Sequence, residues 1–208
     1  MASSQSSDSS ERSPDELAAE KLPRPAALWK HMTEAQRQEA ARAFWVDHDS
    51  AMEQLEIYAL LARRLNFRLK SVQALPLERK VKHLMAMGNV SDGVAGRLLV
   101  AYHLACQRPM MGAFLDALGI PHEDGLIAEG ETTKPDADTL KSAAATLRTS
   151  RAIEDVNLYF STLVLQDADT WGGLLDELPA PGSDQTPPPP EPKASTQKSK
   201  STQKSTRK

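Results

Sequence analysis

The segment 92–107 is apolar on nearly every side of a helix, and this restricts the fold more than any other feature. At 3.6 residues per turn, Val94 and Leu99 fall on different sides of such a helix. A helix that is apolar all round has to be covered on several sides. We therefore expect 92–107 to be the central helix of a compact multi-helix array. Gly93 and Gly96 would let a neighbouring helix approach it closely.

The rest of the body, residues 23–178, is also predicted to be all-α. No stretch in it sustains the two-residue alternation of a strand, whereas apolar residues recur every three or four positions. Thr33 with Gln36, and Ser50 with Glu53, match the capping box that begins a helix. The predicted helices cover approximately 26–31, 34–47, 51–66, 71–75, 77–87, 92–107, 109–118, 135–148, 151–166 and 169–177.

Both ends are predicted to be disordered tails. Residues 1–22 contain seven serines and few large apolar side chains, and residues 179–208 contain seven of the fourteen prolines and no large apolar side chain. Such segments bury too little surface to offset the entropy of ordering. The loop 121–134 divides 23–120 from 135–178 if the body has two parts. One packed unit is preferred, because the last three helices alone bury little.

Charge is segregated along the chain. Residues 24–115 carry thirteen basic and eight acidic side chains, whereas 116–178 carry four basic and thirteen acidic. Seven basic residues lie between positions 63 and 82, opposed by Glu78 alone. They form either an anion or nucleic-acid patch, or solvated faces that pair with the acidic half 116–178, within one body or between two protomers. The seven are Arg63, Arg64, Arg68, Lys70, Arg79, Lys80 and Lys82.

A second basic segment follows the proline run. Residues 193–208 hold six positive charges and no aromatic side chain, within two near-copies of the unit STQKSK. Without aromatic platforms such a tail cannot stack on bases, so nucleic-acid contact would be electrostatic and sequence-blind. It would otherwise act as a solubilising extension. The candidate contacts are Lys198, Lys200, Lys204, Arg207 and Lys208.

No pattern of residues typical of an enzyme site is found in the sequence. It has no phosphate-binding glycine loop, no nucleophile elbow and no metal-ligand spacing, so no cofactor and no metal are predicted. The single cysteine, Cys106, is expected to be a buried, inert thiol. His103 in the central helix is expected to be buried, neutral and hydrogen-bonded. His122, in the loop 121–134, is the best position for a small site.

The helix pair 77–87 and 92–107 has the order of a helix-turn-helix. Its second helix, however, offers only Arg97 and Gln107 to base edges and is otherwise apolar. It is therefore predicted to lie in a core and not in a DNA groove.

The sequence favours a non-enzymatic helical protein that acts by contact with a protein partner or by self-association. The alternative is a nucleic-acid-associated protein that uses the basic tail and the 63–82 patch non-specifically. A third hypothesis is an enzyme or ligand binder with a site near His103 or His122. No apolar stretch is long enough to cross a membrane and the N-terminal residues lack the pattern of a secretory signal, so a cytoplasmic location is expected.

Overall fold

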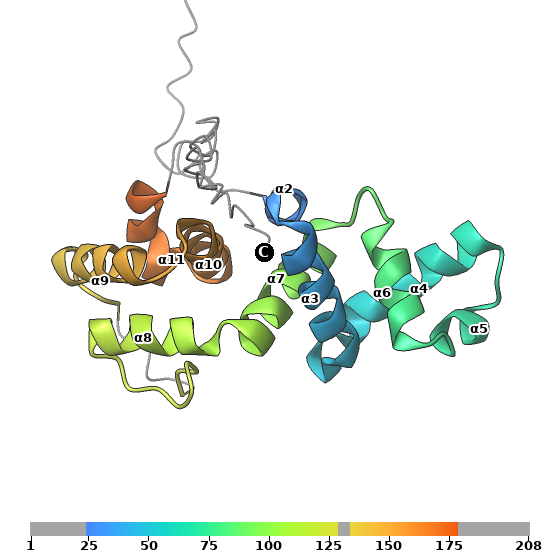
Figure 1. The fold of residues 1–208 in the computed structure, drawn as a ribbon, viewed down its shortest axis with the longest axis horizontal. Helices are drawn as coiled ribbons and strands as arrows, with labels where there is room; N and C mark the ends of the chain where they lie inside the picture. The colour runs from blue at the N-terminus through green and yellow to red at the C-terminus, as the bar shows by residue number, and fades with distance from the viewer. Residues whose placement is uncertain (1–23, 129–133, 179–208) are drawn as a thin grey trace, which may run out of the picture.

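The computed structural model describes residues 24–128 and 134–178, and the all-α prediction is confirmed for these residues (Figure 1). Their regular structure consists of α-helices and two short 3₁₀ helices. The elements are α2 (Pro25–His31), α3 (Glu34–Val46), η1 (His48–Ser50), α4 (Ala51–Leu65), α5 (Leu69–Gln73), α6 (Leu77–Met85), α7 (Asp92–Cys106), α8 (Arg108–Leu118), α9 (Ala137–Ser150), α10 (Ile153–Gln166), α11 (Ala168–Trp171) and η2 (Gly172–Glu177).

The helix starts follow the predicted capping signals in one case and depart from them in another. Thr33 and Gln36 form the predicted capping box at the start of α3, with each side chain accepting a backbone N–H of the other residue. The second predicted box, at Ser50, is wrong. The Ser50 hydroxyl donates to the Asp47 carboxylate at 2.5 Å, so its side chain is turned back from the start of α4.

The helix α7 occupies the centre, as the apolar segment 92–107 predicts. It contacts α2, α3, α4, α8 and α10. Val94, Leu98 and Leu99 on it are fully buried, which gives the helix its apolar covering on several sides. Its apolar character therefore serves packing between helices.

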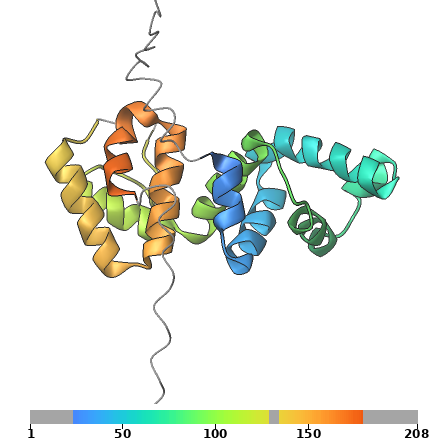
Figure 2. The same ribbon diagram turned by 90° about the horizontal axis from the view of Figure 1, so that it is seen from above.

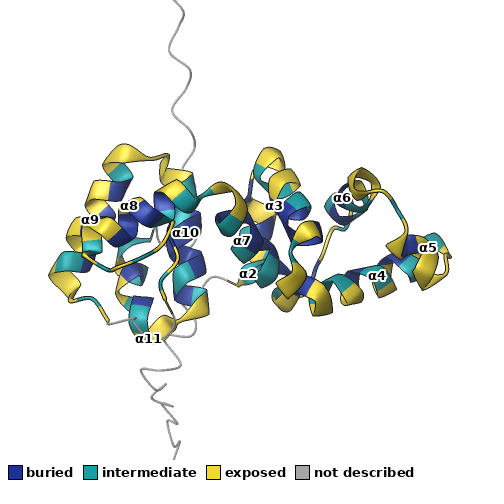
Figure 3. Cartoon of the chain, turned by 90° about the horizontal axis from the view of Figure 1, so that it is seen from below, coloured by how far each residue is buried: buried dark blue, intermediate teal, exposed yellow. Residues whose placement is uncertain are grey.

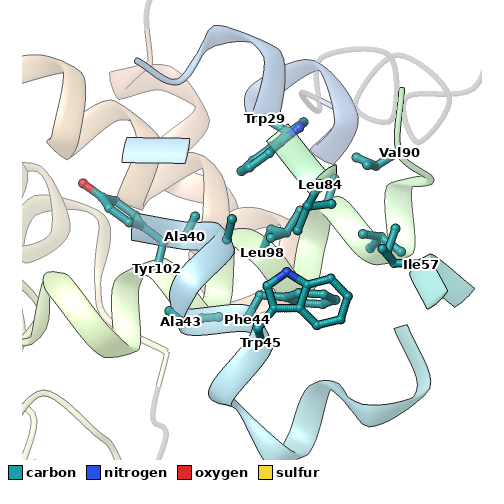
Figure 4. Close-up of a cluster of buried hydrophobic side chains, with 14 of the residues drawn as sticks. Trp29, Ala40, Ala43, Phe44, Trp45, Ile57, Leu84, Val90, Leu98 and Tyr102 are labelled. Carbon is teal, nitrogen blue, oxygen red and sulfur yellow. The ribbon is translucent and has the colours of Figure 1, made fainter. Parts of the chain in front are cut away.

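The buried side chains form two separate apolar clusters, which define two lobes. The first lobe, residues 24–106, is built around α3 and α7 and includes Trp29, Phe44 and Ile57 (Figure 4). The second lobe, residues 108–178 without 129–133, is built from α8 to η2 around Phe114 and Phe160. Because α8 packs into the second cluster, the boundary between the two lobes lies at Gln107 and not at the loop 121–134. The folding of 23–178 as one unit stays a prediction.

The two lobes meet along α7 and α10. Leu158 of α10 belongs to the apolar cluster of the first lobe. His103 of α7 and Thr162 of α10 share a buried hydrogen bond of 3.1 Å, and Gln36 of α3 donates to Asp155 at 2.7 Å. Beyond this junction the lobes diverge, with α4–α6 at one end of the molecule and α9–α11 at the other (Figures 1 and 2).

Both predicted tails, 1–22 and 179–208, lie outside the described residues. None of the helices described in 24–128 and 134–178 has the length and apolar character required to span a bilayer.

Candidate interaction surface

The end of the first lobe carries the predicted basic patch. We call residues 51–85, which comprise α4, α5, α6 and their connecting turns, the basic arm. The arm holds seven basic side chains and three acidic ones. Its helices contact α3, α7 and η1, and in two perpendicular views the arm lies away from α9–α11 (Figures 1 and 2).

Two of the seven predicted basic residues are held by the fold. Lys80 is half-buried, donates to the Tyr58 hydroxyl at 3.0 Å, and places its ammonium over the rings of Trp45 and Tyr58. Arg64 donates to the backbone oxygen of Ala86 at 3.0 Å and thereby ties α4 to the turn after α6. These two cations stabilise the arm.

The other five predicted residues are exposed and form no ion pair with any described residue. Glu78, the only acidic residue between positions 63 and 82, forms an ion pair with Arg42 of α3 at 3.1 Å. Pairing of the patch with the acidic half 116–178 is therefore not found within one chain among the residues that the structure describes, and pairing between two protomers stays a prediction. The five available cations are Arg63, Arg68, Lys70, Arg79 and Lys82.

The arm also exposes apolar side chains, which the sequence analysis missed. Nine large apolar residues are exposed in the described residues, and six of them belong to the arm. Met52 is 76% exposed and Phe67 is 52% exposed, which are large fractions for side chains of this size. The outer faces of α4 and α5 are accordingly exposed in Figure 3. The six are Met52, Leu55, Leu60, Phe67, Leu69 and Leu77.

The spacing along α4 explains this exposure. Positions 52, 55 and 59 follow one face of the helix, while Ile57 and Leu61 follow the opposite face and are fully buried. An amphipathic surface helix normally turns such an apolar face inward. Here α4 is apolar on two faces, and only one of them is covered by the chain. An exposed apolar surface rimmed by charge is typical of an interaction site.

The prediction that His103 is buried and hydrogen-bonded is confirmed. Its ring is 3% exposed, and Nε2 lies 3.1 Å from the Thr162 hydroxyl oxygen. Because that hydroxyl donates to the Leu158 carbonyl at 2.8 Å, its oxygen accepts from the ring, and Nε2 carries the proton. Burial lowers the pKa of His103 from 6.5 to about 4. The ring is therefore neutral at physiological pH and joins the two lobes.

The loop at His122 is held tightly against α8. His122 Nε2 lies 3.1 Å from Asp116 Oδ1, and its Nδ1 accepts the backbone N–H of Gly125 at 3.1 Å. Arg108 pairs with Asp124 at 3.1 Å. A shallow hollow of about 600 Å³ beside the loop is lined by Arg108, His122, Asp124 and Leu126, among others. Since both ring nitrogens are already bonded, His122 has no free nitrogen for a substrate, and the loop is a structural clasp.

A reverse turn with two positive φ angles forms the tip of this clasp. Asp124 has φ 50° and Gly125 has φ 80°, and the flanking Glu123 and Leu126 exchange two backbone hydrogen bonds. This is the pattern of a tight hairpin turn for which Asp-Gly is a preferred pair. A side chain at Gly125 would approach the backbone oxygen of Arg108 to 2.9 Å. The dipeptide was the available sequence signal for this turn.

Two further predictions about small residues are wrong. Cys106 is exposed and not buried, and partial desolvation raises the pKa of its thiol, which disfavours the reactive thiolate. No neighbouring helix packs closely against Gly93 or Gly96. A Cβ at Gly96 would meet no atom within 4 Å, and both glycines line a groove of about 300 Å³ between α7 and α10.

Metal ligands do not converge in the described residues, where no group of three His, Cys, Asp or Glu side chains is found. Asp47 instead accepts the Asp49 backbone N–H, the Ser50 hydroxyl and an Arg97 guanidinium N–H. The cluster Asp47-His48-Asp49 therefore forms the corner between α3 and α4. The predicted tail contacts Lys198, Lys200, Lys204, Arg207 and Lys208 lie outside the described residues.

Comparison of the chain with models of protein families, with curated proteins and with solved structures found no match.

Proposed function

We propose that the protein is an interaction module and that its basic arm is the docking surface for a protein partner. The observation that carries this proposal is the coincidence, on one arm, of six exposed apolar residues with five unpaired exposed cations. Apolar contact supplies affinity on burial, and complementary charge supplies orientation and rapid association. The partner that fits is an acidic protein surface with apolar side chains among the acids.

The histidine geometry offers less support for an enzyme. His103 has its one unbonded nitrogen, Nδ1, in the protein interior, and the nitrogens of His122 are both engaged in the clasp. General acid–base catalysis requires such a nitrogen within hydrogen-bond reach of a substrate. The arm, in contrast, is accessible along its length.

The test compares two variants that lose the same amount of positive charge. In the arm-neutral variant, four arm cations become glutamine: Arg63→Gln, Arg68→Gln, Lys70→Gln and Lys82→Gln. In the control variant, four exposed cations elsewhere become glutamine: Lys30→Gln, Lys134→Gln, Lys141→Gln and Arg151→Gln. Partners captured on the full chain are identified, purified and titrated against both variants.

The proposal predicts that the purified partner binds the arm-neutral variant at least about tenfold more weakly than the unmodified chain, a difference of about 1.4 kcal/mol. Binding to the control variant should be unchanged. The variant pair Met52→Ser with Leu55→Ser should weaken binding without changing its dependence on salt. Equal binding of the arm-neutral and control variants would overturn the proposal.

A second candidate is non-specific nucleic-acid binding, favoured by the five unpaired cations on one arm. Each phosphate neutralised on a duplex contributes about −0.9 to the log–log salt slope, so five contacts set a limit near −4.5. Titration of a duplex against the full chain and against a chain without 193–208 separates arm from tail. Binding that survives the deletion belongs to the arm. The exposed apolar residues favour a protein partner, because a phosphate backbone cannot cover them.

A further inference from the structure

We propose that the occupant of the basic arm is the acidic second lobe of another copy of this chain, so that the protein associates head to tail. This inference rests on the proposed function, since it takes the arm as the docking surface and names the partner. Its basis is that the two ends of the molecule carry opposite charge and that each of them exposes large apolar side chains.

The charges are complementary and spatially separated. Residues 116–178 carry thirteen acidic and four basic side chains, a net charge of −9. Several of the acids are exposed and form no ion pair with any described residue. Across an interface, such a surface attracts the five unpaired cations of the arm. Four of these exposed acids are Glu123, Asp138, Glu154 and Asp169.

The apolar surface is complementary as well. The only large apolar residues exposed on the second lobe are Leu126 and Ile153, among the described residues, at 39% and 41%. Ile153 is followed directly by Glu154, and Leu126 is bridged to Glu123. The second lobe therefore presents apolar side chains among acids, whereas the arm presents apolar side chains among cations. Each surface lacks the charge that the other supplies.

Contact between these surfaces cannot form within one chain in this structure. The arm lies at one end of the molecule and α9–α11 lie at the other, with α3 and α7 between them (Figures 1 and 2). A contact between copies joins two different surfaces, so it is heterologous, and an assembly that does not close into a ring leaves an arm and an acidic lobe free at its ends. Association should therefore grow with concentration and weaken as salt screens the charges.

The experiment uses two variants of the full chain, each of which removes four charges from one of the two surfaces. The arm-neutral variant defined above keeps its acidic lobe and loses the arm charge. The acid-neutral variant keeps the arm and loses four acids: Glu123→Gln, Asp138→Asn, Glu154→Gln and Asp169→Asn. Sedimentation velocity measures the assembly state of each alone and of an equimolar mixture, at about 50 mM and about 500 mM salt.

The unmodified chain should form concentration-dependent oligomers at low salt that weaken at least about tenfold at high salt. Each variant alone should stay monomeric under conditions where the unmodified chain associates. Their mixture should form a 1:1 dimer that does not extend, because it contains one intact arm and one intact acidic lobe. Circular dichroism should show the same helix content in all three chains.

Three outcomes overturn the head-to-tail assembly: an unmodified chain that stays monomeric at low salt, an acid-neutral variant that still associates alone, or a mixture that stays monomeric. The proposed function is tested separately by the purified partner. If the chain is monomeric but the arm-neutral variant loses that partner, the proposed function stands and only the identity of the occupant is wrong. If the arm-neutral variant still self-associates and still binds the purified partner, both proposals fail.

Discussion

The two lobes are built from similar amphipathic helices but cover them to different extents. In the second lobe, α8 packs against α9, and Phe114 of α8 contacts Phe160 of α10 and Trp171 of α11. Only Leu126 and Ile153 remain exposed among the large apolar residues described there. In the first lobe, α2, α3 and α7 form a similar core, but α4 and α5 extend beyond it with an apolar face uncovered (Figure 3).

The difference shows that apolar content alone does not decide burial. A helix is covered only where other elements reach it, and α4 extends past the reach of α3 and α7. The charge follows the same division, since the exposed arm is basic and the closed lobe is acidic. The open lobe thus leaves six large apolar side chains of the arm exposed, whereas the closed lobe leaves only Leu126 and Ile153 exposed among those described there.

The largest expected effect comes from replacing one phenylalanine in each lobe by alanine. Phe160 is fully buried against Phe114 and Tyr159, so Phe160→Ala should lower the free energy of unfolding by about 3–5 kcal/mol. Phe67 is half exposed at the tip of the arm, and Phe67→Ala should lower it by less than about 1 kcal/mol. Urea unfolding measures both. Equal losses would mean that the arm is as closely packed as the second lobe.

The junction between the lobes should respond to pH. The folded pKa of His103 is about 4 against 6.5 unfolded, so below pH 6.5 the unfolded chain binds a proton that the folded chain excludes. Stability is unaffected above pH 6.5 and falls by about 1.4 kcal/mol per pH unit towards pH 4, about 3 kcal/mol in all. The loss should disappear from the pH profile of His103→Gln and persist in His31→Gln, whose side chain is exposed. Identical profiles for the two variants would show that His103 is not excluded from protonation.

Replacing Gly125 in the turn of the clasp by any larger residue should destabilise the second lobe. Gly125→Ala combines a φ of 80° with a 2.9 Å approach to the Arg108 oxygen, and should cost about 1–3 kcal/mol. Gly88 in the first lobe has open space and no left-handed φ, so Gly88→Ala should leave stability unchanged or slightly raise it. Thermal unfolding compares them. A neutral Gly125→Ala would show that the turn relaxes without cost.

The smallest predicted effect concerns the start of α3 in the first lobe. Thr33→Ala removes the hydroxyl that accepts the Gln36 backbone N–H at 3.2 Å, and should cost about 1 kcal/mol. The conservative change Thr33→Ser should restore most of the loss, because serine presents the same oxygen. Failure of serine to do so in chemical unfolding would assign the effect to the lost methyl group.

Much of the fold was predictable because helix periodicity and caps are local. The segment 92–107 indicated a buried central helix, and the Thr33 capping box was readable from four residues. Ser50 was not predictable in the same way, because its hydroxyl is turned towards Asp47, which competes with the cap. Cys106 was misplaced because periodicity does not show where the neighbours of α7 end.

The candidate site was only half predictable. The seven basic residues were visible in the sequence, but their accessibility depends on the separation of the lobes, which places the acidic half out of reach. The exposed face of α4 was not visible, since Met52 and Leu55 have the spacing of core residues. The Asp124-Gly125 pair, by contrast, was a local signal that indicated the turn.

The most direct test of the docking surface is hydroxyl-radical footprinting of the protein alone and bound to its purified partner. Met52 is the most exposed large apolar residue in the described chain, and Phe67 lies farther along the same arm. If the arm is the docking surface, modification of Met52 and Phe67 should fall several-fold on binding. Modification of the exposed Lys30 on α2, which serves as the control, should stay unchanged. If both residues react at an unchanged rate while a partner is bound, the arm is not the docking surface.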